Sequence, residues 1–448
     1  MKESSFLYAL LRRLMKPGVQ VFYRRIQIVG QSNFPKQGAV LVCGNHVNAF
    51  MDPVALQLHS DRPLYSLARG DAFQKNWAKR LLTQLHILPI YRKSEGVENL
   101  SKNEASFSAS AELLQNQQAL IIYPEAICVQ ERRIRKLKKG AARILFEAAA
   151  KNEFKSSILA LPVGMNYTKP YQFRSDLLII IGEPLKAESY ASIYRANPQK
   201  ALVQFTNDLE LELQTNTIHL QNPVYDQLIE LLFDLYLPVI NARHRGCDLL
   251  TSFQNQQQIV SVLNQLSLVP ETSIQDNGLN HQIKQLEEQL LNFSNTYPGL
   301  NPVQINLSFF SRVVRLLALI VGYPIFSLGL ILHGLPFWLG NWASNRLAKN
   351  REFKASLMMS IAWISWMLLF LLQTICILFL PISHTHKVET FTIYILLGFF
   401  TLYFHDFLTI NKAIIQLTFK REGKGSAVKK THEKWKSLKE LCEKIFQL

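Results

Sequence analysis

"GAVLVCGNHVNAFMDPVAL", residues 38–56, joins an apolar run to a group of polar side chains. The run ends at Asn45 and His46, and Asp52 follows a few residues later. One interpretation is a buried strand, a turn, and a helix with Asp52 as its N-cap and Pro53 in its first turn, positions that these residue types favour. The other is a general base, His46, held in place by the carboxylate of Asp52.

The surrounding sequence, from residue 26 to residue 190, alternates short apolar runs with helix-like stretches. Near-continuous Val, Ile and Leu runs separated by helices predict an α/β domain with a largely buried sheet. Helices are expected at 72–86 and 100–117. Strands are expected at the seven runs IQIVG, AVLVCG, PLYSLA, ILPIYR, ALIIYPE, ILALPVGMNY and LLIIIG.

Polar residues follow three of these runs. One run leads into His46, with Asp52 just beyond it, another into Arg92 and a third into Glu125. Ligand sites in such sheets gather beyond the ends of the strands, so we expect these four side chains to converge. Each also has a structural interpretation, as a strand-end histidine, a helix cap, a surface arginine or a turn residue. Four such coincidences within one domain favour a functional site.

A strongly basic stretch, "QERRIRKLKKGAARI" at 130–144, follows the Glu125 run. It holds one acid, Glu131, and seven basic residues: Arg132, Arg133, Arg135, Lys136, Lys138, Lys139 and Arg143. Such a run is often only a solvated face. Its position after Glu125 favours phosphate binding, with Lys138 and Lys139 among the ligands. No recognition-helix or RNA-binding signature accompanies it, so no nucleic-acid partner is expected.

The composition sets wider limits. A chain of 448 residues is long enough for two or three domains. Its net charge of +16 points to an anionic partner, either nucleic acid, anionic lipid or a phosphorylated substrate. The five cysteines are scattered and odd in number, which indicates a reducing compartment without a disulfide framework.

The C-terminal third contains three long apolar runs, at 316–339, 355–380 and 391–410. Crossing a bilayer takes about 20 mostly apolar residues, so the second and third runs predict a transmembrane hairpin, 357–380 and 391–410. The first run contains glycines and prolines that are expected to break it into short pieces, as in a re-entrant or interfacial segment. A plain three-span protein is the alternative.

Loop charges predict the orientation of these segments. The loop 341–354 carries four basic residues against one acid, and the tail beyond residue 410 is strongly basic. Positively charged loops stay in the cytoplasm, so both are expected there. A first run that crossed fully would place the N-terminal domain outside, away from phosphorylated and thioester metabolites. We therefore expect an integral protein of the cytoplasmic membrane with its catalytic domain facing the cytoplasm.

The remaining segments complete the expected domain organisation. Residues 1–25 predict a basic amphipathic helix, which either lies on a membrane or packs on the protein. Residues 26–195 form the α/β domain, and 196–311 a polar helical subdomain with no nameable chemistry. Membrane segments occupy 312–410, and 411–448 is a basic cytoplasmic tail.

Four stretches, "NHVNAFMD", "ILPIYR", "IIYPEA" and "LALPVGMNY", resemble in order and spacing the four motifs of the glycerolipid acyltransferase family. That family contains glycerol-3-phosphate and 1-acylglycerol-3-phosphate (lysophosphatidate) acyltransferases, and the resemblance covers roughly residues 20–190. It implies an α/β fold with a mixed, largely buried sheet flanked by helices. It also implies an O-acyltransferase of phospholipid synthesis in which acyl-CoA or acyl-carrier protein is the co-substrate and no other cofactor is used.

The resemblance also implies roles for individual residues. His46 is the general base and Asp52 supports it. Arg92 and Glu125 help bind the phosphorylated glycerol acceptor, and membrane lipid is expected as a further partner. Asn48 belongs to a longer form of the first motif, with five residues rather than four between histidine and aspartate. The third motif has Ala126 where glycine is usual, and because alanine disfavours positive φ, that turn is expected to differ.

These two departures motivate an alternative: a non-enzymatic lipid-binding or scaffold protein with a degenerate acyltransferase domain. The chemistry of the first interpretation is coherent, because a neutral imidazole can take the proton of an alcohol as the oxygen attacks a thioester. A carboxylate on the other ring nitrogen would fix the tautomer. No serine or cysteine nucleophile motif appears, and no HExxH or clustered ligand set predicts a metal.

Overall fold

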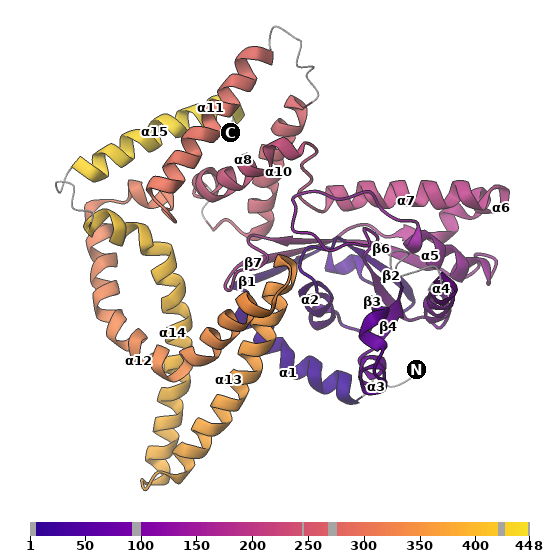
Figure 1. Cartoon of the computed structure of the whole chain (residues 1–448), viewed down its shortest axis with the longest axis horizontal. Coiled ribbons are helices and arrows are strands. Elements are labelled where there is room, and N and C mark those ends of the chain that lie inside the picture. Colours follow the sequence, from indigo (N-terminus) through magenta and orange to yellow (C-terminus); the bar gives the residue numbers. More distant parts are fainter. Residues whose placement is uncertain (1–5, 92–99, 244–245, 268–275, 420–425, 447–448) are drawn as a thin grey trace. The chain divides into compact units, whose positions relative to one another are not determined.

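The computed structural model divides the chain into two compact units (Figure 1). The first unit combines Met1–His219 with Ser344–Met359, and the second combines Leu220–Ala343 with Ser360–Leu448. The structure describes residues 6–91, 100–243, 246–267, 276–419 and 426–446. This division differs from the sequence-based one, because a segment from between two apolar runs belongs to the first unit and the end of the chain folds with the helical region.

One mixed sheet forms the centre of the first unit. Within the described residues it has eight strands, in the order β1-β7-β6-β2-β5-β3-β4, and β8 pairs with β6. The strands from β6 to β4 run parallel, whereas β7 and β8 are antiparallel to β6. The seven predicted runs are the first seven strands. The bounds are β1 Arg25–Val29, β2 Ala39–Gly44, β3 Leu64–Arg69, β4 Ile87–Ile90, β5 Ala119–Ile122, β6 Ile158–Tyr167, β7 Asp176–Ile181 and β8 Leu185–Lys186.

Helices cover both faces of the sheet. The connections β2–β3 and β3–β4 run one way along the strand order, and β4–β5 and β5–β6 run the other way. Because such crossovers are right-handed, the two pairs of helices lie on opposite faces. The first pair is α2 (Met51–His59) and α3 (Asn76–Gln84), and the second is α4 (Leu100–Gln115) and α5 (Gly140–Ala150).

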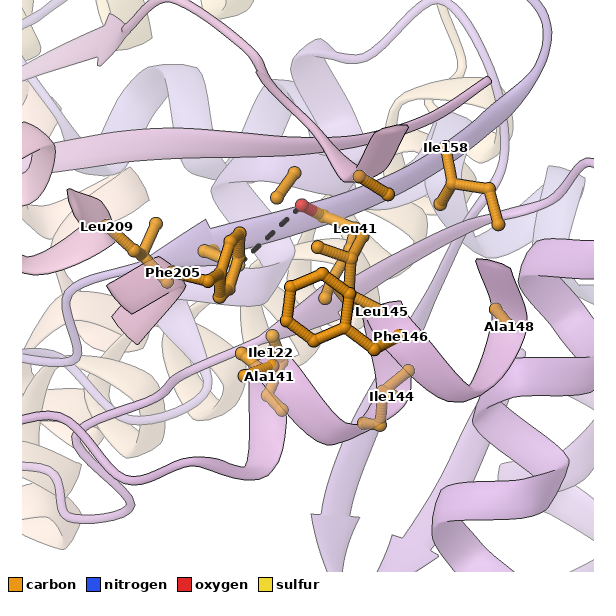
Figure 2. Close-up of a cluster of buried hydrophobic side chains, with 14 of the residues drawn as sticks. Leu41, Ile122, Ala141, Ile144, Leu145, Phe146, Ala148, Ile158, Phe205 and Leu209 are labelled. Atoms are coloured by element: carbon orange, nitrogen blue, oxygen red, sulfur yellow. Dashed lines mark hydrogen bonds between the residues drawn. The ribbon is translucent and has the colours of Figure 1, made fainter. Parts of the chain in front are cut away.

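The main core lies between the sheet and the helices α4, α5 and α7 (Pro198–Thr215). Figure 2 shows Phe146 of α5 and Phe205 of α7 among side chains from the strands, including Leu41 of β2. Val40 and Val42 point to the opposite face and are equally buried. β2 is therefore buried on both faces, which explains its unbroken apolar sequence and fixes the position of the loop that follows it.

The N-terminal helix α1 (Phe6–Phe22) packs on this unit along one face. Tyr8, Val19 and Phe22 are buried, and the Tyr8 ring stacks on His86. On another face, the apolar side chains at positions 6, 10 and 14 are exposed at one-turn spacing. One face of this helix thus packs on the protein, and another presents apolar side chains that could contact a membrane.

The second unit contains the helical region and the end of the chain. α11 (Asp276–Thr296) and α15 (Ser426–Phe446) lie side by side (Figure 1). Trp435 of α15 is almost completely buried and contacts Phe293 of α11. Part of the expected basic tail is thus an amphipathic helix whose apolar face packs inside the unit. The other helices here are α8 Asp226–Leu231, α9 Leu237–Asn241 and α10 Leu249–Leu266, with a π-helical turn at Leu232–Tyr236.

Within the described residues, three helices are long and apolar enough to cross a membrane: α12 Phe309–Leu347, α13 Lys354–Phe379 and α14 His384–Phe419. This supports the prediction of a membrane-associated protein. The prediction that glycines and prolines break the first run into pieces is wrong, because α12 is one helix with Pro324 and Pro336 inside it. Figure 1 shows α12 bent along its length, as interior prolines cause.

The glycines of α12 serve close packing. A Cβ on Gly322 would lie 2.2 Å from the Phe404 ring, and one on Gly329 would lie 1.7 Å from Thr401 Oγ1. Both partners belong to α14. Helices packed without a hydrophobic driving force approach closely at small residues, which is what these two positions permit.

Candidate active site

The loop between β2 and α2 brings His46 and Asp52 together. Nδ1 of His46 lies 2.8 Å from Oδ2 of Asp52. The same carboxylate oxygen accepts hydrogen bonds from the backbone N–H groups of Val47, at 3.0 Å, and Asn48, at 2.8 Å. Asp52 is not the N-cap of α2, since Phe50 holds that position without a side-chain cap. Its carboxylate instead organises the loop that carries the histidine.

The second oxygen of Asp52 is also bound. Tyr167, the last residue of β6, donates its hydroxyl to Oδ1 at 2.7 Å. The Asp52 side chain is completely buried, and such hydrogen bonds offset the cost of burying a polar group. Burial and then the charge of Asp52 raise the pKa of Tyr167 well above its ordinary value, so the hydroxyl remains a donor.

The histidine ring is held on one side and open on the other. Since Nδ1 faces the carboxylate, Nε2 is the unprotonated nitrogen of the neutral ring. Among the described residues none is hydrogen-bonded to Nε2, and the His46 side chain is 19% exposed. The ring of Tyr123 stacks on the imidazole with centroids 4.1 Å apart. The arrangement leaves one basic nitrogen facing outward.

Gly44 makes room for that stacking ring. A Cβ at this position would lie 3.1 Å from Cε1 of Tyr123, closer than ordinary van der Waals contact. Tyr123 follows β5, the strand next to β2. The glycine before the first motif thus allows the tyrosine of the third motif to reach the histidine ring.

Glu125 fixes the backbone of the same histidine. Oε1 accepts from the N–H of His46 at 3.0 Å, and Oε2 accepts from the N–H of Arg135 at 3.1 Å. Burial raises the pKa of Glu125, and these two hydrogen bonds oppose the rise. The N–H of Val129 donates to the His46 carbonyl at 3.1 Å, so the backbone is held on both sides of the His46 Cα. The described contacts of Glu125 are thus to the backbone.

Ala126 adopts the conformation that the sequence made unexpected. Its φ is +58°, in the left-handed region, and its N–H donates to the carbonyl of Tyr123 at 3.0 Å. The prediction that this turn differs because of its Cβ is wrong. The surrounding hydrogen bonds of Glu125 and Tyr123 outweigh a cost of about 1 kcal/mol for a non-glycine residue there.

The acyltransferase family matches residues 25–166, which span β1 to most of β6 and include the residues just described except Tyr167. This part of the chain is therefore similar to acyltransferases, in agreement with the resemblance to the glycerolipid acyltransferase family. A Mycoplasma pneumoniae protein named as a probable 1-acyl-sn-glycerol-3-phosphate acyltransferase is 29% identical over 129 residues. That match covers 28% of this chain and 46% of the relative, so it spans less than half of the relative's length.

A solved structure is also similar, the 1-acyl-sn-glycerophosphate acyltransferase PlsC from Thermotoga maritima. The match covers 48% of this chain and 82% of that one, with 15% identity and a TM-score of 0.34. An acyltransferase domain takes an acyl donor and an acceptor in lipid synthesis, and this much applies to residues 25–166.

The other predicted site residues of the acyltransferase domain lie in different settings. Asn48 is completely buried, and its Nδ2 donates to the Pro170 carbonyl at 2.8 Å and to the Tyr23 hydroxyl at 3.2 Å. Lys138 and Lys139 are exposed just before α5, and the N–H of Lys138 donates to the Pro124 carbonyl at 2.8 Å. The two lysines are therefore accessible to an anionic ligand, whereas the Asn48 side chain holds parts of the domain together. Arg92 lies outside the described residues.

Among the residues that the structure describes, one group resembles a metal site. His46, Asp52 and Cys128 have ligand atoms within 4.8 Å of one another. However, Asp52 Oδ2 already accepts three hydrogen bonds, and the Cys128 Sγ accepts one from the N–H of Ala49. Burial raises the pKa of the Cys128 thiol, whereas metal binding requires the thiolate. These residues do not fit a metal ion.

Sequence reasoning missed the roles of Tyr167, Tyr123 and Cys128. A signal was present for the tyrosines, because each stands at the end of a predicted apolar run, as His46 does. Cys128 carried no such signal. Its position follows from the left-handed turn at Ala126, which returns the chain to the His46 loop.

Proposed function

We propose that this protein transfers a fatty acyl group from an activated donor to a hydroxyl of glycerol 3-phosphate or lysophosphatidate in phospholipid synthesis. The observation that carries this proposal is the pairing of His46 Nδ1 with Asp52 while Nε2 stays open. The donor is acyl-CoA or acyl-carrier protein as co-substrate, and no other cofactor is required. The match to a probable 1-acyl-sn-glycerol-3-phosphate acyltransferase supports the choice of acceptor.

The mechanism follows from the pairing of His46 Nδ1 with Asp52, which leaves Nε2 of the neutral ring able to accept a proton. Nε2 of His46 takes the proton of the acceptor hydroxyl while the oxygen attacks the thioester carbonyl. Asp52 stabilises the imidazolium that forms, and its fixed hydrogen bonds need no rearrangement during the reaction. Collapse of the tetrahedral intermediate expels the thiolate, which recovers a proton from the imidazolium. The products are the ester and the free thiol.

Direct transfer, without an acyl-enzyme, is part of the proposal. Cys128 is the nearest cysteine to the imidazole among the described residues. Its thiol has a raised pKa because it is buried and lies near Asp52, so little thiolate is available as a nucleophile. A hydroxyl activated by His46 is the better nucleophile in this setting.

The acceptor phosphate requires cations near the histidine. Lys138 and Lys139 are exposed in the stretch that Glu125 joins to the His46 loop through the N–H of Arg135. We include them, with Arg92, in the proposed acceptor site. A planar guanidinium binds phosphate in a bidentate manner, while the lysines add charge.

We also propose that the enzyme is integral to the cytoplasmic membrane and faces the cytoplasm. Residues 344–359 belong to the same compact unit as the acyltransferase domain, although they follow α12. A single complete crossing by α12 would separate them, so this grouping supports a bent α12 that enters and returns. The basic loop and tail then place both on the cytoplasmic side.

The test compares His46→Ala with the full-length wild type in lipid vesicles, using a labelled acyl donor and either glycerol 3-phosphate or lysophosphatidate. We expect at least ~100-fold loss of turnover with both acceptors. His432→Ala, in the exposed surface of α15, is the matched control and should keep full activity. Full activity in His46→Ala would reject the mechanism.

The same assay tests the scaffold alternative. Ala126 and the lengthened first motif motivated it, and Ala126 adopts a left-handed conformation in the structure. Asp52→Asn should reduce turnover by at least ~100-fold, because an amide leaves the ring in the wrong tautomer. Equal acyl transfer by wild-type and Asp52→Asn membranes, in a host lacking its own enzyme, would favour a scaffold.

A further inference from the structure

A short segment between two apolar helices contacts the acyltransferase domain. Residues Arg351–Phe353 form a 3-10 turn between α12 and α13. The guanidinium of Arg351 lies 3.9 Å above the ring centroid of Tyr171. The ring of Phe353 contacts that of Phe50, with centroids 5.9 Å apart. These contacts lie within one compact unit, which contains residues 344–359.

Further contacts hold this segment in the first unit. Gln130 Nε2 is 3.4 Å from the Arg351 carbonyl oxygen. Ala355 and Ser356, in the first turn of α13, are almost completely buried, as are Met358 and Met359. The segment is therefore part of the folded domain and not a free loop.

All three contact points adjoin the first motif. Phe50 lies between His46 and Asp52, in the part of the chain that the fifth intervening residue lengthens. Pro170, next to Tyr171, accepts the hydrogen bond from Asn48. Val129, next to Gln130, donates to the carbonyl of His46. The turn thus contacts Phe50, which belongs to the catalytic loop, and two residues that are next to hydrogen-bond partners of that loop.

The chemistry of Arg351 suits an anionic ligand. Its side chain is exposed, and within the described residues its guanidinium is in no ion pair. Stacking on Tyr171 fixes the plane of the guanidinium and leaves its N–H edge available. That edge matches two phosphate oxygens.

We propose that the turn 351–353 completes the acceptor side of the active site. Arg351 binds the phosphate of the acceptor, and Phe353 covers the lengthened loop at Phe50. This inference rests on the proposed function for the identity of the reaction, and it adds a phosphate ligand from outside the 25–166 match.

Chain length adds a consequence for the source of that phosphate. The part of α13 that no longer belongs to the first unit begins at Ser360, seven residues after Phe353. A helix of that length spans about 10 Å, and Ser360–Phe379 spans about 30 Å, the thickness of the hydrocarbon core. The turn is thus tethered close to the bilayer surface, where a monoacyl acceptor presents its phosphate.

The experiment measures KM and kcat for both substrates, with full-length protein in vesicles. Arg351→Ala should raise KM for a phosphorylated acceptor by at least ~10-fold, as loss of a charged hydrogen-bonded contact predicts. KM for the acyl donor and kcat should change less than about 2-fold. Arg351→Lys should be intermediate, and Lys349→Ala, in the same loop, should match the wild type. Equal acceptor KM in Arg351→Ala and wild type overturns the inference.

Two further arms separate the possible outcomes. Repeating the assay in phosphatidylcholine vesicles, without anionic lipid, should leave the Arg351→Ala effect unchanged. Its disappearance there means that Arg351 contacts anionic lipid, and the inference fails. Thermal stabilisation by glycerol 3-phosphate, compared with glycerol, reports binding without turnover. An Arg351-dependent stabilisation in a protein that lacks acyl transfer would support the phosphate site while rejecting the proposed function.

Discussion

The carboxylate of Glu125 accepts a hydrogen bond of 3.0 Å from the backbone N–H of His46. The two residues follow the adjacent parallel strands β5 and β2, whose carboxyl ends meet at one edge of the sheet. The other carboxylate oxygen of Glu125 accepts a hydrogen bond from the backbone N–H of Arg135, at the start of the exposed basic residues. One buried side chain therefore links the proposed general base, His46, to the expected phosphate-binding stretch.

Glu125→Gln should lower kcat by ~10-fold or more while changing KM for the acceptor less than about 3-fold. Glutamine would place its carbonyl oxygen opposite one of the two backbone N–H groups and its NH₂ opposite the other. The second N–H would therefore be buried without an acceptor. The measurement is steady-state kinetics together with circular dichroism to establish folding. A large rise in acceptor KM at unchanged kcat would instead support the substrate-binding role that the sequence predicted.

Gly44→Ala should reduce kcat by ~10-fold. The added Cβ meets the Tyr123 ring at 3.1 Å and displaces the surface on which the His46 imidazole stacks. Gly140→Ala is the matched control, because a Cβ there meets Phe107 at an ordinary 3.7 Å. Gly140 lies in α5, so its replacement should keep activity and increase stability slightly. Equal activities of the two variants would show that the contact at Gly44 is unimportant.

Asp176 gives a stability prediction with a defined pH dependence. Burial acts to raise its pKa, but hydrogen bonds from Arg24 and Arg25 hold the pKa below its ordinary value. A lowered folded-state pKa stabilises the protein above the unfolded pKa of about 3.9, and this contribution is lost as pH falls through the folded-state pKa.

Asp176→Asn should therefore destabilise the protein at pH 7 by about 2 kcal/mol, a value reduced because both arginines are partly exposed. The difference in melting temperature from wild type should be full at pH 7 and shrink below about pH 4. Asp61→Asn, at an exposed site, should show no difference at either pH. A gap for Asp176→Asn that stayed constant down to pH 3 would contradict the assigned pKa direction.

The orientation in the membrane is testable by labelling introduced cysteines in a Cys376→Ser background, since Cys376 is exposed. A cysteine at Ser383, in the short turn between α13 and α14, should react with a membrane-impermeant reagent in intact cells. One at Lys349 should react only after the membrane is opened. Ser344 belongs to the same predicted loop but lies near the end of α12 and is buried, so it is unsuitable as a probe. Labelling at Lys349 from outside would refute the proposed orientation.

The sequence predicted the strands well because of how they are buried. Strands covered on both faces, such as β2 and β5, are unbroken apolar runs, and seven of these runs were recognisable. β8, with two residues, is too short to show a pattern. The same patterns placed His46 and Glu125 at neighbouring strand ends, which the contact between them bears out.

Other features depended on contacts that no local pattern contains. Tyr167 and Asp52 are 115 positions apart, and only the pairing of β6 with β2 brings them together. Packing also overrode local propensity. α12 remains continuous through its prolines, and the left-handed turn at Ala126 forms despite its Cβ. The sequence divided the segment 344–359 between a basic loop, 341–354, and the start of an apolar run, and neither pattern shows that the segment packs on the first unit.

The position of that segment has a consequence for the order of synthesis. The catalytic unit needs residues 344–359, yet the ribosome makes them only after all of Leu220–Ala343, including most of α12. The unit therefore cannot finish folding while the first apolar helix is still emerging. Newly made chains acquire their complete active site only once the machinery that inserts them into the bilayer has engaged. On the proposed function, we expect the new chain to be inactive as an acyltransferase until it reaches the membrane surface that holds its substrate.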